Sequence, residues 1–380
     1  MNNKSTVFLQ NIISPYRARF FNKLNEKYDD FSLYYMGETE PDKYWDVSKI
    51  EMHYDHWIDR HGLCLKLSKT FFIHLNPVLL YKIFRSKSIK NIVLAVSWND
   101  PTIFFILLMR RLHLTSKRLF FWAEANYLTN GSRKENWLKL HLKRFAFDCV
   151  DGAMIIPGRM SEISFEKWGV KLRNVIYLPN VINDSGLKYD PDNVRAQNTT
   201  PVFIMPMRVI ESVKGGLNFF RAIGEENVRK AVFYVCGDGE DMEMYKNFIR
   251  EHRYEDRIVM KGFCSTEDMK ELYNKANGFI LPSFSDPSPL SMIEALNLHM
   301  PILCSSHCGN HFEAVEEGEN GYTFSPLDPA EIKAKFERFL SDRDRWTEMG
   351  ETSARLYRER FETDMVVTKF VEQFNRYKKE

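Results

Sequence analysis

The sequence predicts an α/β protein made of two doubly wound domains, and three observations lead to this fold class. First, the 380 residues suffice for two domains of about 150 residues each. Second, short apolar runs alternate with helical patterns through both halves, and several runs are almost wholly apolar, as in parallel sheets covered on both faces. Third, residues 184–200 are polar, contain Gly and Pro and show little periodicity, which is typical of a linker.

The first half contains strands and helices in alternation. Predicted strands lie at residues 6–10, 32–36, 91–96, 119–123, 152–156 and 175–178. Predicted helices between them lie at residues 15–28, 102–112 and 135–147. We expect these elements to form an amino-terminal domain at residues 1–183, because β and α units that alternate build a parallel sheet.

The second half repeats this rhythm and predicts a carboxyl-terminal domain at residues 201–361. Predicted strands lie at residues 202–207, 231–236, 257–260, 278–281, 302–304 and 322–324. The stretch from residue 330 to residue 380 is helical in pattern and highly charged. Two such domains in sequence predict a ligand cleft between them, at the carboxyl ends of their strands.

Charge is divided unevenly between the halves. Residues 1–183 contain 27 Lys and Arg against 17 Asp and Glu, whereas residues 184–380 contain 26 against 34. The halves therefore carry +10 and −8, which give the chain its net charge of +2. A basic first half suits a phosphate-bearing or membrane-surface ligand. The alternative is that the solvated faces simply differ. The basic residues are dispersed and no base-reading module is present, so we expect no nucleic acid as a partner.

Cysteine usage and apolar content indicate a cytoplasmic protein. The 6 Cys are scattered without the spacing of a disulfide framework, which suits a reducing compartment. The longest apolar run, residues 103–109, is far shorter than the ~20 residues that span a bilayer. The first residues show no apolar h-region and no cleavage site, so we expect no signal peptide.

Residues 283–301 form the most informative segment for function. It follows the apolar strand 278–281, and Ser288 and Pro289 suit the N-cap and first position of a helix that runs to about His299. The first free amides, at Leu290 and Ser291, would then favour an anion, phosphate above all.

Two acids flank this predicted anion site. Asp286 lies on the loop before the helix, and Glu294 lies one turn into it. Their positions suit hydrogen bonds to hydroxyl groups on either side of a phosphate. The alternative is that Asp286 caps the turn and Glu294 is a solvated helix residue.

Two further segments carry candidate binding residues. Arg208 follows the strand 202–207, and Lys214 precedes Gly215 and Gly216 at the entry to a helix. A planar guanidinium and a point charge together can neutralise a diphosphate, although both cations could instead be ordinary surface residues. The third segment contains Gly237 and Gly239 without the third glycine of a dinucleotide fingerprint, so we reject a nicotinamide site and expect a tight turn there.

The ordered motifs of the second half resemble the retaining GT-B glycosyltransferases of family 4, also described as glycosyl transferases group 1. These motifs are Arg208…Lys214-Gly215, Gly237-Asp-Gly239, Gly262-Phe263, Leu281-Pro-Ser283, Asp286-x7-Glu294-Ala295, Gly309…Glu313 and Gly318…Asn320-Gly321. The resemblance is close over about 120 residues. In the first half it rests on the β/α rhythm and on residues 11–17, a start typical of the bacterial surface-polysaccharide branch.

The resemblance implies a GT-B fold, with two Rossmann-like domains that face a central cleft and a carboxyl-terminal helix at about residues 362–380 that crosses back to the first domain. It also implies roles for single residues. Arg208 and Lys214 match the pair that binds the donor diphosphate, and the amides of Leu290 and Ser291 match those that meet the phosphate. Residues 261–263, with Gly262 and Phe263, fall where the nucleobase packs.

The two acids of segment 283–301 fall on the E-x7-E motif of the family. Glu294 matches the acid that binds the ribose hydroxyls. Asp286 falls on the acid that contacts the transferred sugar, but it is one methylene shorter than the usual Glu, which leaves the identity of the sugar open. Gly237 belongs to the same donor-binding set.

The first half departs from the family at its first loop, where Ser14-Pro15-Tyr16-Arg17 replaces a Gly-rich sequence. Ser14 and Pro15 again suit a helix start, so Ser14 and Tyr16 are acceptor-side candidates. Glu124 ends the strand 119–123, where the family often places a polar residue near the acceptor; the alternative is a surface acid.

Two other groups of residues give weaker indications of a functional role. The Cys and His residues at 304, 307, 308 and 311 have zinc-like chemistry but not the spacing of a finger or ribbon, so we expect no metal site. His307 or His311 could still touch a substrate. Asp100 precedes Pro101 and is interpreted as a helix cap rather than as an acceptor-side residue.

The resemblance implies an enzyme that moves a sugar from a UDP- or GDP-sugar to a hydroxyl of a glycan or lipid-linked acceptor with retention, in capsule- or O-antigen-like polysaccharide biosynthesis. We expect no cofactor and no metal, because two cations can do the work of a metal, and we expect the inner face of the plasma membrane as a peripheral location. The alternatives are a sugar-nucleotide 2-epimerase and a nucleotide-sugar-binding module without catalysis, the latter because Asp286 replaces Glu.

Overall fold

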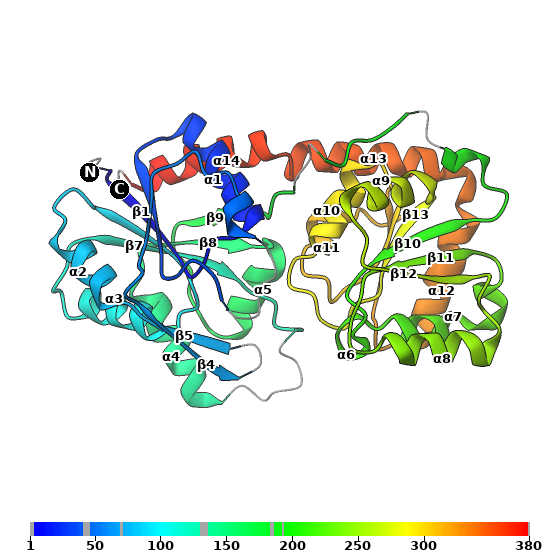
Figure 1. Cartoon of the computed structure of the whole chain (residues 1–380), viewed down its shortest axis with the longest axis horizontal. Coiled ribbons are helices and arrows are strands. Elements are labelled where there is room, and N and C mark those ends of the chain that lie inside the picture. The colour runs from blue at the N-terminus through cyan, green and yellow to red at the C-terminus, as the bar shows by residue number, and fades with distance from the viewer. Residues whose placement is uncertain are drawn as a thin grey trace. The chain divides into compact units, whose positions relative to one another are not determined.

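The computed structural model describes residues 4–40, 46–68, 71–129, 136–182, 186–191 and 194–378. The chain divides into two compact units (Figure 1). The first comprises Met1–Ala125, Ser132–Pro179 and Thr363–Glu380, and the second comprises Asn126–Gly131 and Asn180–Glu362. The polar segment 184–200 therefore counts with the second unit, and within it residues 194–197 form a short 3-10 turn.

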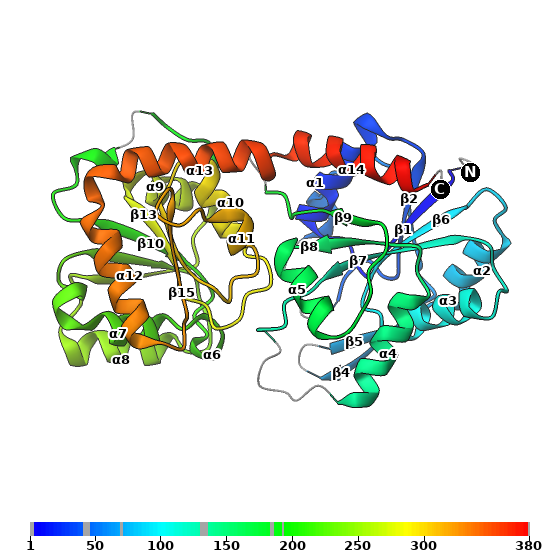
Figure 2. The same ribbon diagram turned by 180° about the vertical axis from the view of Figure 1, so that it is seen from behind.

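The first unit is built on a seven-stranded parallel sheet with the order β3-β2-β1-β6-β7-β8-β9 (Figures 1 and 2). A separate antiparallel hairpin, β4–β5, belongs to the same unit. The strands are β1 (Thr6–Gln10), β2 (Phe31–Tyr35), β3 (His56–Ile58), β4 (Leu63–Ser68), β5 (Phe71–Leu75), β6 (Asn91–Ala95), β7 (Arg118–Glu124), β8 (Gly152–Ile156) and β9 (Val175–Tyr177).

Helices cover both faces of this sheet. Phe120 and Phe121 are adjacent on β7, so their side chains point to opposite faces. Phe120 contacts Phe374 of α14, whereas Phe121 contacts Phe147 of α4. The helices of this unit are α1 (Pro15–Lys27), α2 (Pro77–Arg85), α3 (Pro101–Arg111), α4 (Trp137–Asp148), α5 (Arg159–Lys167) and α14 (Thr363–Tyr377).

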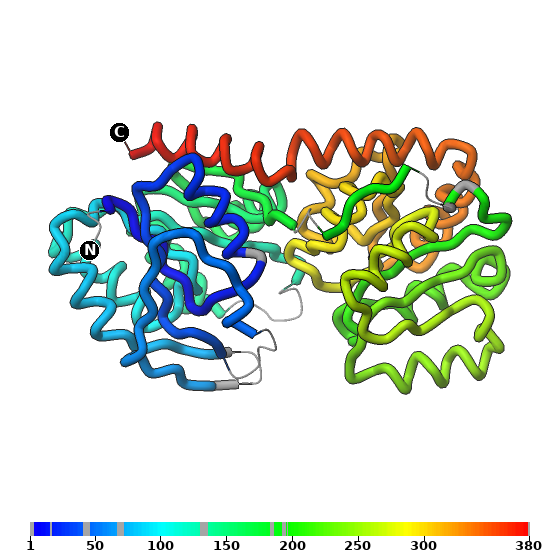
Figure 3. The backbone as a smooth tube through the Cα atoms, turned by 45° about the horizontal axis from the view of Figure 1, so that its top comes forward, coloured from blue at the N-terminus to red at the C-terminus, as the bar shows by residue number. Residues whose placement is uncertain are grey.

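The last helix, α14, completes the aromatic core of the first unit. Figure 3 traces the chain from α13 into α14, which packs along α1. Phe370 and Phe374 are both 1% exposed, and their rings contact those of Phe8 and Phe20. The predicted crossing of the carboxyl-terminal helix to the first domain is thus confirmed by the structure.

The second unit is built on a six-stranded parallel sheet with the order β12-β11-β10-β13-β14-β15. Its strands are β10 (Val202–Pro206), β11 (Val232–Cys236), β12 (Ile258–Gly262), β13 (Gly278–Leu281), β14 (Ile302–Ser305) and β15 (Gly321–Phe324). Its helices are α6 (Glu211–Lys214), α7 (Gly216–Val228), α8 (Met242–His252), α9 (Thr266–Lys275), α10 (Leu290–Asn297), α11 (His311–Ala314), α12 (Pro329–Ser341) and α13 (Trp346–Arg360).

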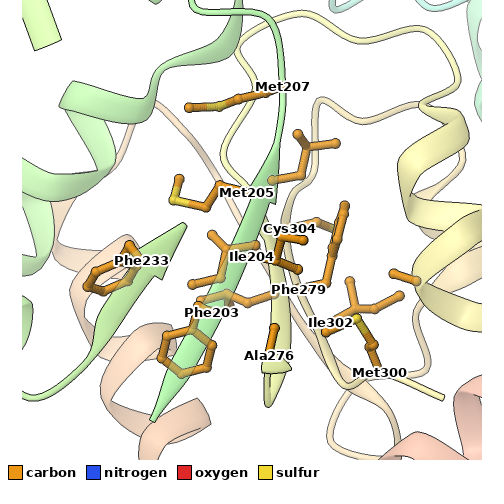
Figure 4. Close-up of a cluster of buried hydrophobic side chains, with 14 of the residues drawn as sticks. Phe203, Ile204, Met205, Met207, Phe233, Ala276, Phe279, Met300, Ile302 and Cys304 are labelled. Atoms are coloured by element: carbon orange, nitrogen blue, oxygen red, sulfur yellow. The ribbon is translucent and has the colours of Figure 1, made fainter. Parts of the chain in front are cut away.

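The core of the second unit is one continuous cluster of buried apolar side chains. Figure 4 shows Phe203 and Ile204 of β10 beside Phe279 of β13 and Ile302 of β14. All four side chains are 0% exposed. Such near-continuous apolar strands are expected for a parallel sheet buried on both faces.

Most predicted elements are confirmed to within two residues at either end. Several elements were not predicted from the sequence, among them β3, the β4–β5 hairpin and α2 within residues 47–85, and α5 at Arg159–Lys167. Leu63 and Leu65 of the hairpin are 61% and 45% exposed, so their apolar pattern does not mark a buried face. The Asn76-Pro77 pair, which begins α2, was the local signal available for that helix.

We predict that Phe374→Ala destabilises the first unit by about 3–5 kcal/mol, because it deletes a buried ring that contacts several others. Chemical denaturation, with hydrogen exchange of the β1 amides as the local probe, measures the loss. The control Glu372→Ala removes an exposed side chain of the same helix and should change stability by no more than about 0.5 kcal/mol. Equal stability of both variants would contradict the packing of α14 on this unit.

Candidate functional site

The candidate site lies in the second unit, where the order of the strands reverses. β10 pairs with β13 on one side and with β11 on the other, so the chain leaves β10 in one direction and β13 in the other. In open parallel sheets this switch point, at the carboxyl ends of the strands, is where ligands bind. The loop after β10 carries Arg208 and Lys214, and the loop after β13 carries Asp286.

An ion pair joins these two loops. Lys214 Nζ lies 2.5 Å from Asp286 Oδ2, and the side chains are only 15% and 11% exposed. Gly215 follows Lys214 with a φ of 62°, and a Cβ there would lie 2.9 Å from the carbonyl oxygen of Pro282. Glycine therefore allows the chain that carries Lys214 to approach the loop that carries Asp286.

Glu211 holds the helix turn that ends at Lys214. Its carboxylate accepts hydrogen bonds from the amides of Leu217 and Asn218, at 2.9 and 2.8 Å, at the start of α7. It also accepts one from Tyr245 Oη at 2.6 Å. A carboxylate at the positive end of a helix is stabilised there. Glu211 was not among the predicted site residues, although an acid shortly before a Gly-Gly helix entry was a usable signal.

The glycine loop after β11 supports the segment that carries Arg208. A Cβ at Gly237 would lie 2.0 Å from the Met207 carbonyl oxygen, and one at Gly239 would lie 2.2 Å from that of Val209. These close approaches explain both glycines as packing positions behind the β10 loop. Arg208 itself is exposed, and no described residue pairs with its guanidinium.

Helix α10 begins one residue later than predicted. Pro289 is its N-cap rather than its first residue, with an extended ψ of 122°, and Ser288 provides no side-chain cap. The Pro289 carbonyl accepts a hydrogen bond from Asn310 Nδ2 at 3.1 Å, which holds this residue outside the helix. The helix ends at Asn297 rather than near His299, which has a φ of 52°. Among the described residues, none accepts a hydrogen bond from the Leu290 or Ser291 amide.

Glu294 lies one turn into α10 in an apolar setting. Tyr273 Oη donates a hydrogen bond to Glu294 Oε2 at 3.2 Å. Burial raises the pKa of Glu294, an effect that the Tyr273 hydrogen bond opposes. Burial and the carboxylate also raise the pKa of Tyr273, so its hydroxyl stays a donor. Tyr273, which was not a predicted site residue, thus orients this carboxylate.

Gly262 is the last residue of β12, and Phe263 follows it at the same edge of the sheet. Gly262 has a φ of 66° with open space around its Cβ position, and its carbonyl accepts from the Gly237 amide at 2.8 Å. Phe263 is 86% exposed, which is unusual for so large an apolar side chain. The structure therefore leaves an aromatic ring uncovered beside the glycine pair.

Asn126 is a third residue that the sequence did not single out. It is 3% exposed, and its Nδ2 donates to the carbonyl oxygens of His307 and Asp286 at 3.0 and 3.5 Å. His307 Nδ1 in turn lies 2.9 Å from the Phe284 carbonyl oxygen. These bonds fix the backbone of the loop that presents the Asp286 carboxylate.

The Cys and His residues of the 304–311 segment do not form a cluster of metal ligands. In the part of the chain that the structure describes, no group of three or more His, Cys, Asp and Glu could hold a metal ion. Burial raises the pKa of both Cys304 and Cys308 well above the ordinary value, so both remain thiols. His311 donates its Nδ1 hydrogen to the Cys308 carbonyl at 2.7 Å, which closes a local turn.

The predicted acceptor-side residues lie in the first unit. Ser14 is the N-cap of α1 and is 7% exposed, but its side chain makes no capping hydrogen bond. The side chain of Tyr16 lies outside what the structure describes, and Glu124 is exposed at the end of β7. Asp100 caps α3 through the Thr102 amide at 3.0 Å, as predicted.

We predict that Glu294→Gln raises the stability of the protein at pH 7 and leaves it unchanged near pH 4. The raised pKa favours the protonated acid in the fold, so the cost of the buried charge appears as pH rises above the ordinary value of 4.5. Thermal unfolding midpoints across this range measure the effect. Glu271→Gln, whose side chain is 76% exposed on α9, is the matched control and should show no pH-dependent gain. A gain of the same size at pH 4 would contradict the assigned cause.

The sequence of this chain is similar to a known protein family and to several known proteins. Residues 190–356 match the family model described as glycosyl transferases group 1. An uncharacterized glycosyltransferase of Methanocaldococcus jannaschii is 26% identical over 112 residues, which cover 30% of this chain and 28% of that protein. A lipopolysaccharide 1,6-galactosyltransferase of Escherichia coli is 24% identical over 110 residues, or 28% of this chain and 31% of that protein. The chain thus matches about three tenths of the length of these relatives.

Solved structures align along almost the whole chain. A lipopolysaccharide outer core galactosyltransferase in its apo form aligns with a TM-score of 0.72 and 12% identity, over 98% of this chain and 99% of its own. HepE of Anabaena in complex with UDP and glucose aligns with a TM-score of 0.68 and 14% identity, over 98% and 99%. The chain therefore has the GT-B fold, and its second unit carries the segment that matches the glycosyl transferases group 1 model.

Proposed function

We propose that this protein is a glycosyltransferase that moves a sugar from a nucleotide diphosphate sugar to a hydroxyl of a glycan or lipid-linked acceptor. The observation that carries the proposal is the Lys214–Asp286 pair, which gathers a cation and a carboxylate at the switch point, within the segment that matches the family model. The relatives named for lipopolysaccharide synthesis and the neighbour solved with UDP support a sugar-nucleotide donor.

The chemistry of the donor site is electrostatic. As the glycosidic bond breaks, negative charge develops on the leaving diphosphate. Arg208, Lys214 and the unused amides of Leu290 and Ser291 present positive charge and hydrogen-bond donors to that group. Since two cations lie at the phosphate, the site has no need of a metal, and we expect activity in the presence of a chelator.

The remaining donor-site residues suit the nucleoside. The Glu294 carboxylate, oriented by Tyr273, accepts hydrogen bonds from ribose hydroxyls. The exposed ring of Phe263 and the backbone of Gly262 offer a surface for the base. The neighbour HepE was solved with UDP, which supports uridine as the nucleoside of the donor. None of the donor-site residues named above distinguishes uracil from guanine.

Asp286 contacts hydroxyls of the transferred sugar in this proposal. Its bond to Lys214 places the carboxylate beside the cation that the diphosphate uses. The reaction proceeds with retention by a front-face route, in which the leaving phosphate and the incoming hydroxyl share one side of the sugar, and no side chain acts as a nucleophile. The shorter side chain of Asp286, compared with Glu, selects the sugar.

The first unit presents apolar and basic residues that suit the face of an anionic membrane. Trp137 and Leu138 on α4 are 70% and 49% exposed, and Leu112 and Leu114, after α3, are 55% and 63% exposed. Arg111 and Lys139 are exposed on the same two helices. No helix among the described residues has both the length and the apolar character to cross a bilayer. We propose peripheral contact with the cytoplasmic membrane, where lipid-linked acceptors for polysaccharide synthesis reside.

Incubation with a panel of UDP- and GDP-sugars tests the proposal against its two alternatives. A glycosyltransferase releases UDP or GDP slowly by hydrolysis alone and faster with an acceptor extract. A 2-epimerase changes the sugar nucleotide without any acceptor. A binding module releases nothing and leaves the donor intact.

We predict that Lys214→Ala lowers kcat/KM for sugar transfer by at least about 100-fold, because it removes one of the two cations from the developing charge. Release of nucleoside diphosphate measures the rate, and thermal unfolding shows whether the fold persists. Lys246→Ala, an exposed lysine of α8 with a local Glu243 partner, is the control and should retain full activity. Normal turnover by the Lys214→Ala variant would contradict the proposal that Lys214 binds the diphosphate.

We predict that the protein floats with vesicles that contain phosphatidylglycerol at low salt and floats less when both Trp137→Ser and Leu138→Ser are introduced. The two substitutions delete exposed apolar area that would enter the interface. Leu327→Ser, which replaces a 70% exposed leucine of the second unit, is the matched control and should float like the wild type. Absence of wild-type flotation at low salt would count against membrane contact.

A further inference from the structure

The first unit contains a buried polar cluster at its own switch point. Its sheet reverses order between β1 and β6, so the carboxyl ends of these strands mark the position where an open parallel sheet binds a ligand. Asn11 follows β1, and Asp100 lies in the loop after β6. Each is bonded to a further buried residue: Asn11 Nδ2 donates to Glu40 Oε1 at 2.8 Å, and the His74 amide donates to Asp100 Oδ2 at 2.9 Å.

His74 lies between the two carboxylates. Its Nδ1 is 3.1 Å from Asp100 Oδ2, and its Nε2 is 3.6 Å from Glu40 Oε1. All three residues are buried, with exposures of 4%, 3% and 6% for His74, Asp100 and Glu40. Asp100 also accepts the Thr102 amide, so it is held as a pure acceptor and fixes Nδ1 as the donor.

The other ring nitrogen of His74 is not satisfied. Among the described residues Nε2 makes no hydrogen bond, although it is fully buried and directed at the Glu40 carboxylate. Buried polar atoms without a partner are rare in folded proteins, so the close approach of Nε2 to the Glu40 carboxylate is unusual. Glu40 Oε2 likewise has no hydrogen-bond partner among the described residues.

A cavity opens at Glu40. Its volume is about 360 Å³, and its described lining consists of Thr39, Glu40, Cys64, Lys66 and Phe72. This volume lies at the lower end of the range of about 300–1,000 Å³ for small-molecule sites. Burial, with the charges of Glu40 and Asp100, raises the pKa of the Cys64 thiol, so Cys64 is not a nucleophile there.

The chemistry of the lining matches a saccharide ring. A carboxylate accepts hydrogen bonds from hydroxyl groups, and the bonds are strong because the acceptor is charged. The ring of Phe72 offers an apolar wall to the C–H face of a pyranose, and Lys66 Nζ lies 5.5 Å from the centroid of that ring. An acid, an aromatic ring and small polar groups in a cavity of this size are a combination that a single sugar unit can satisfy.

We propose that this cavity is a saccharide-binding subsite of the first unit, in which Glu40 binds ring hydroxyls and Asn11 positions the Glu40 carboxylate through its 2.8 Å hydrogen bond. This inference rests on the proposed glycosyltransferase function, because it assigns the subsite to the sugar unit of the acceptor. Glu40 touches the saccharide, whereas Asn11 acts only through Glu40. None of Ser14, Tyr16 and Glu124, the acceptor-side residues expected from the sequence, is part of the subsite.

Saturation-transfer NMR on the full-length protein tests the subsite with methyl α-glycosides of glucose, galactose, mannose and N-acetylglucosamine as probes. At least one probe should bind the wild type, and Glu40→Gln should weaken its binding at least tenfold, since a charge-assisted hydrogen bond is lost. Glu51→Gln, whose side chain is 84% exposed on the same unit, is the matched control and should bind like the wild type. Phe72→Ala weakens the same probe without disturbing the buried cluster, which keeps the test valid if Glu40→Gln unfolds.

A double-mutant cycle separates positioning from structural roles. Asn11→Ala alone should weaken saccharide binding, but it should add nothing to Glu40→Gln, because Asn11 acts through that carboxylate. Independent, additive losses would overturn the positioning role of Asn11. Binding of no probe by the wild type, or equal binding by the wild type and Glu40→Gln, would overturn the subsite.

Nucleotide binding distinguishes failure of the subsite from failure of the proposed function. Thermal shift with UDP and GDP reports on the second unit and should be the same for the wild type and Glu40→Gln. A protein that binds a nucleoside diphosphate but no glycoside contradicts the subsite alone. A protein that binds neither nucleotide contradicts the donor site on which the proposed function rests.

Discussion

One electrostatic contact underlies the candidate site: Lys214 pairs with Asp286 where the strand order of the second unit reverses. These residues are 72 positions apart in the sequence, yet β10 and β13 are neighbours in the sheet, so their loops leave the same edge. In the absence of a ligand, the carboxylate neutralises the cation, which avoids a nearly buried unpaired charge. We propose that a diphosphate in this site competes with Asp286 for Lys214 and frees the carboxylate for sugar hydroxyls.

Several neighbouring residues hold the two segments of this ion pair in position. Glu211 and Gly215 fix the turn that ends at Lys214, and Asn126 fixes the backbone at Asp286. Gly237 and Gly239 are required by their close approach to the backbone on either side of Arg208. Their role is thus to hold the guanidinium-bearing segment in place, and direct contact with a nucleotide is not needed to explain them.

The sequence predicted the parallel sheets well, because buried strands are apolar along their whole length. It missed the β4–β5 hairpin, since exposed residues such as Leu65 carry no burial signal, and it placed the start of α10 one residue early, because Asn310 holds the Pro289 carbonyl from a distant position. Arg208, Lys214, Asp286 and Glu294 could be proposed from motifs alone. Their partners could not, because Tyr273, Asn126 and Glu211 act through contacts between segments that only the folded chain brings together.

The most direct test of the central claim is calorimetric titration with UDP and UMP, and with GDP and GMP, at constant salt. If the diphosphate is held by Arg208, Lys214 and the amides of α10, the diphosphate of at least one base should bind at least about tenfold more tightly than its monophosphate, which corresponds to about 1.4 kcal/mol. Equal affinities of mono- and diphosphate for both bases would show that these groups do not form a diphosphate site.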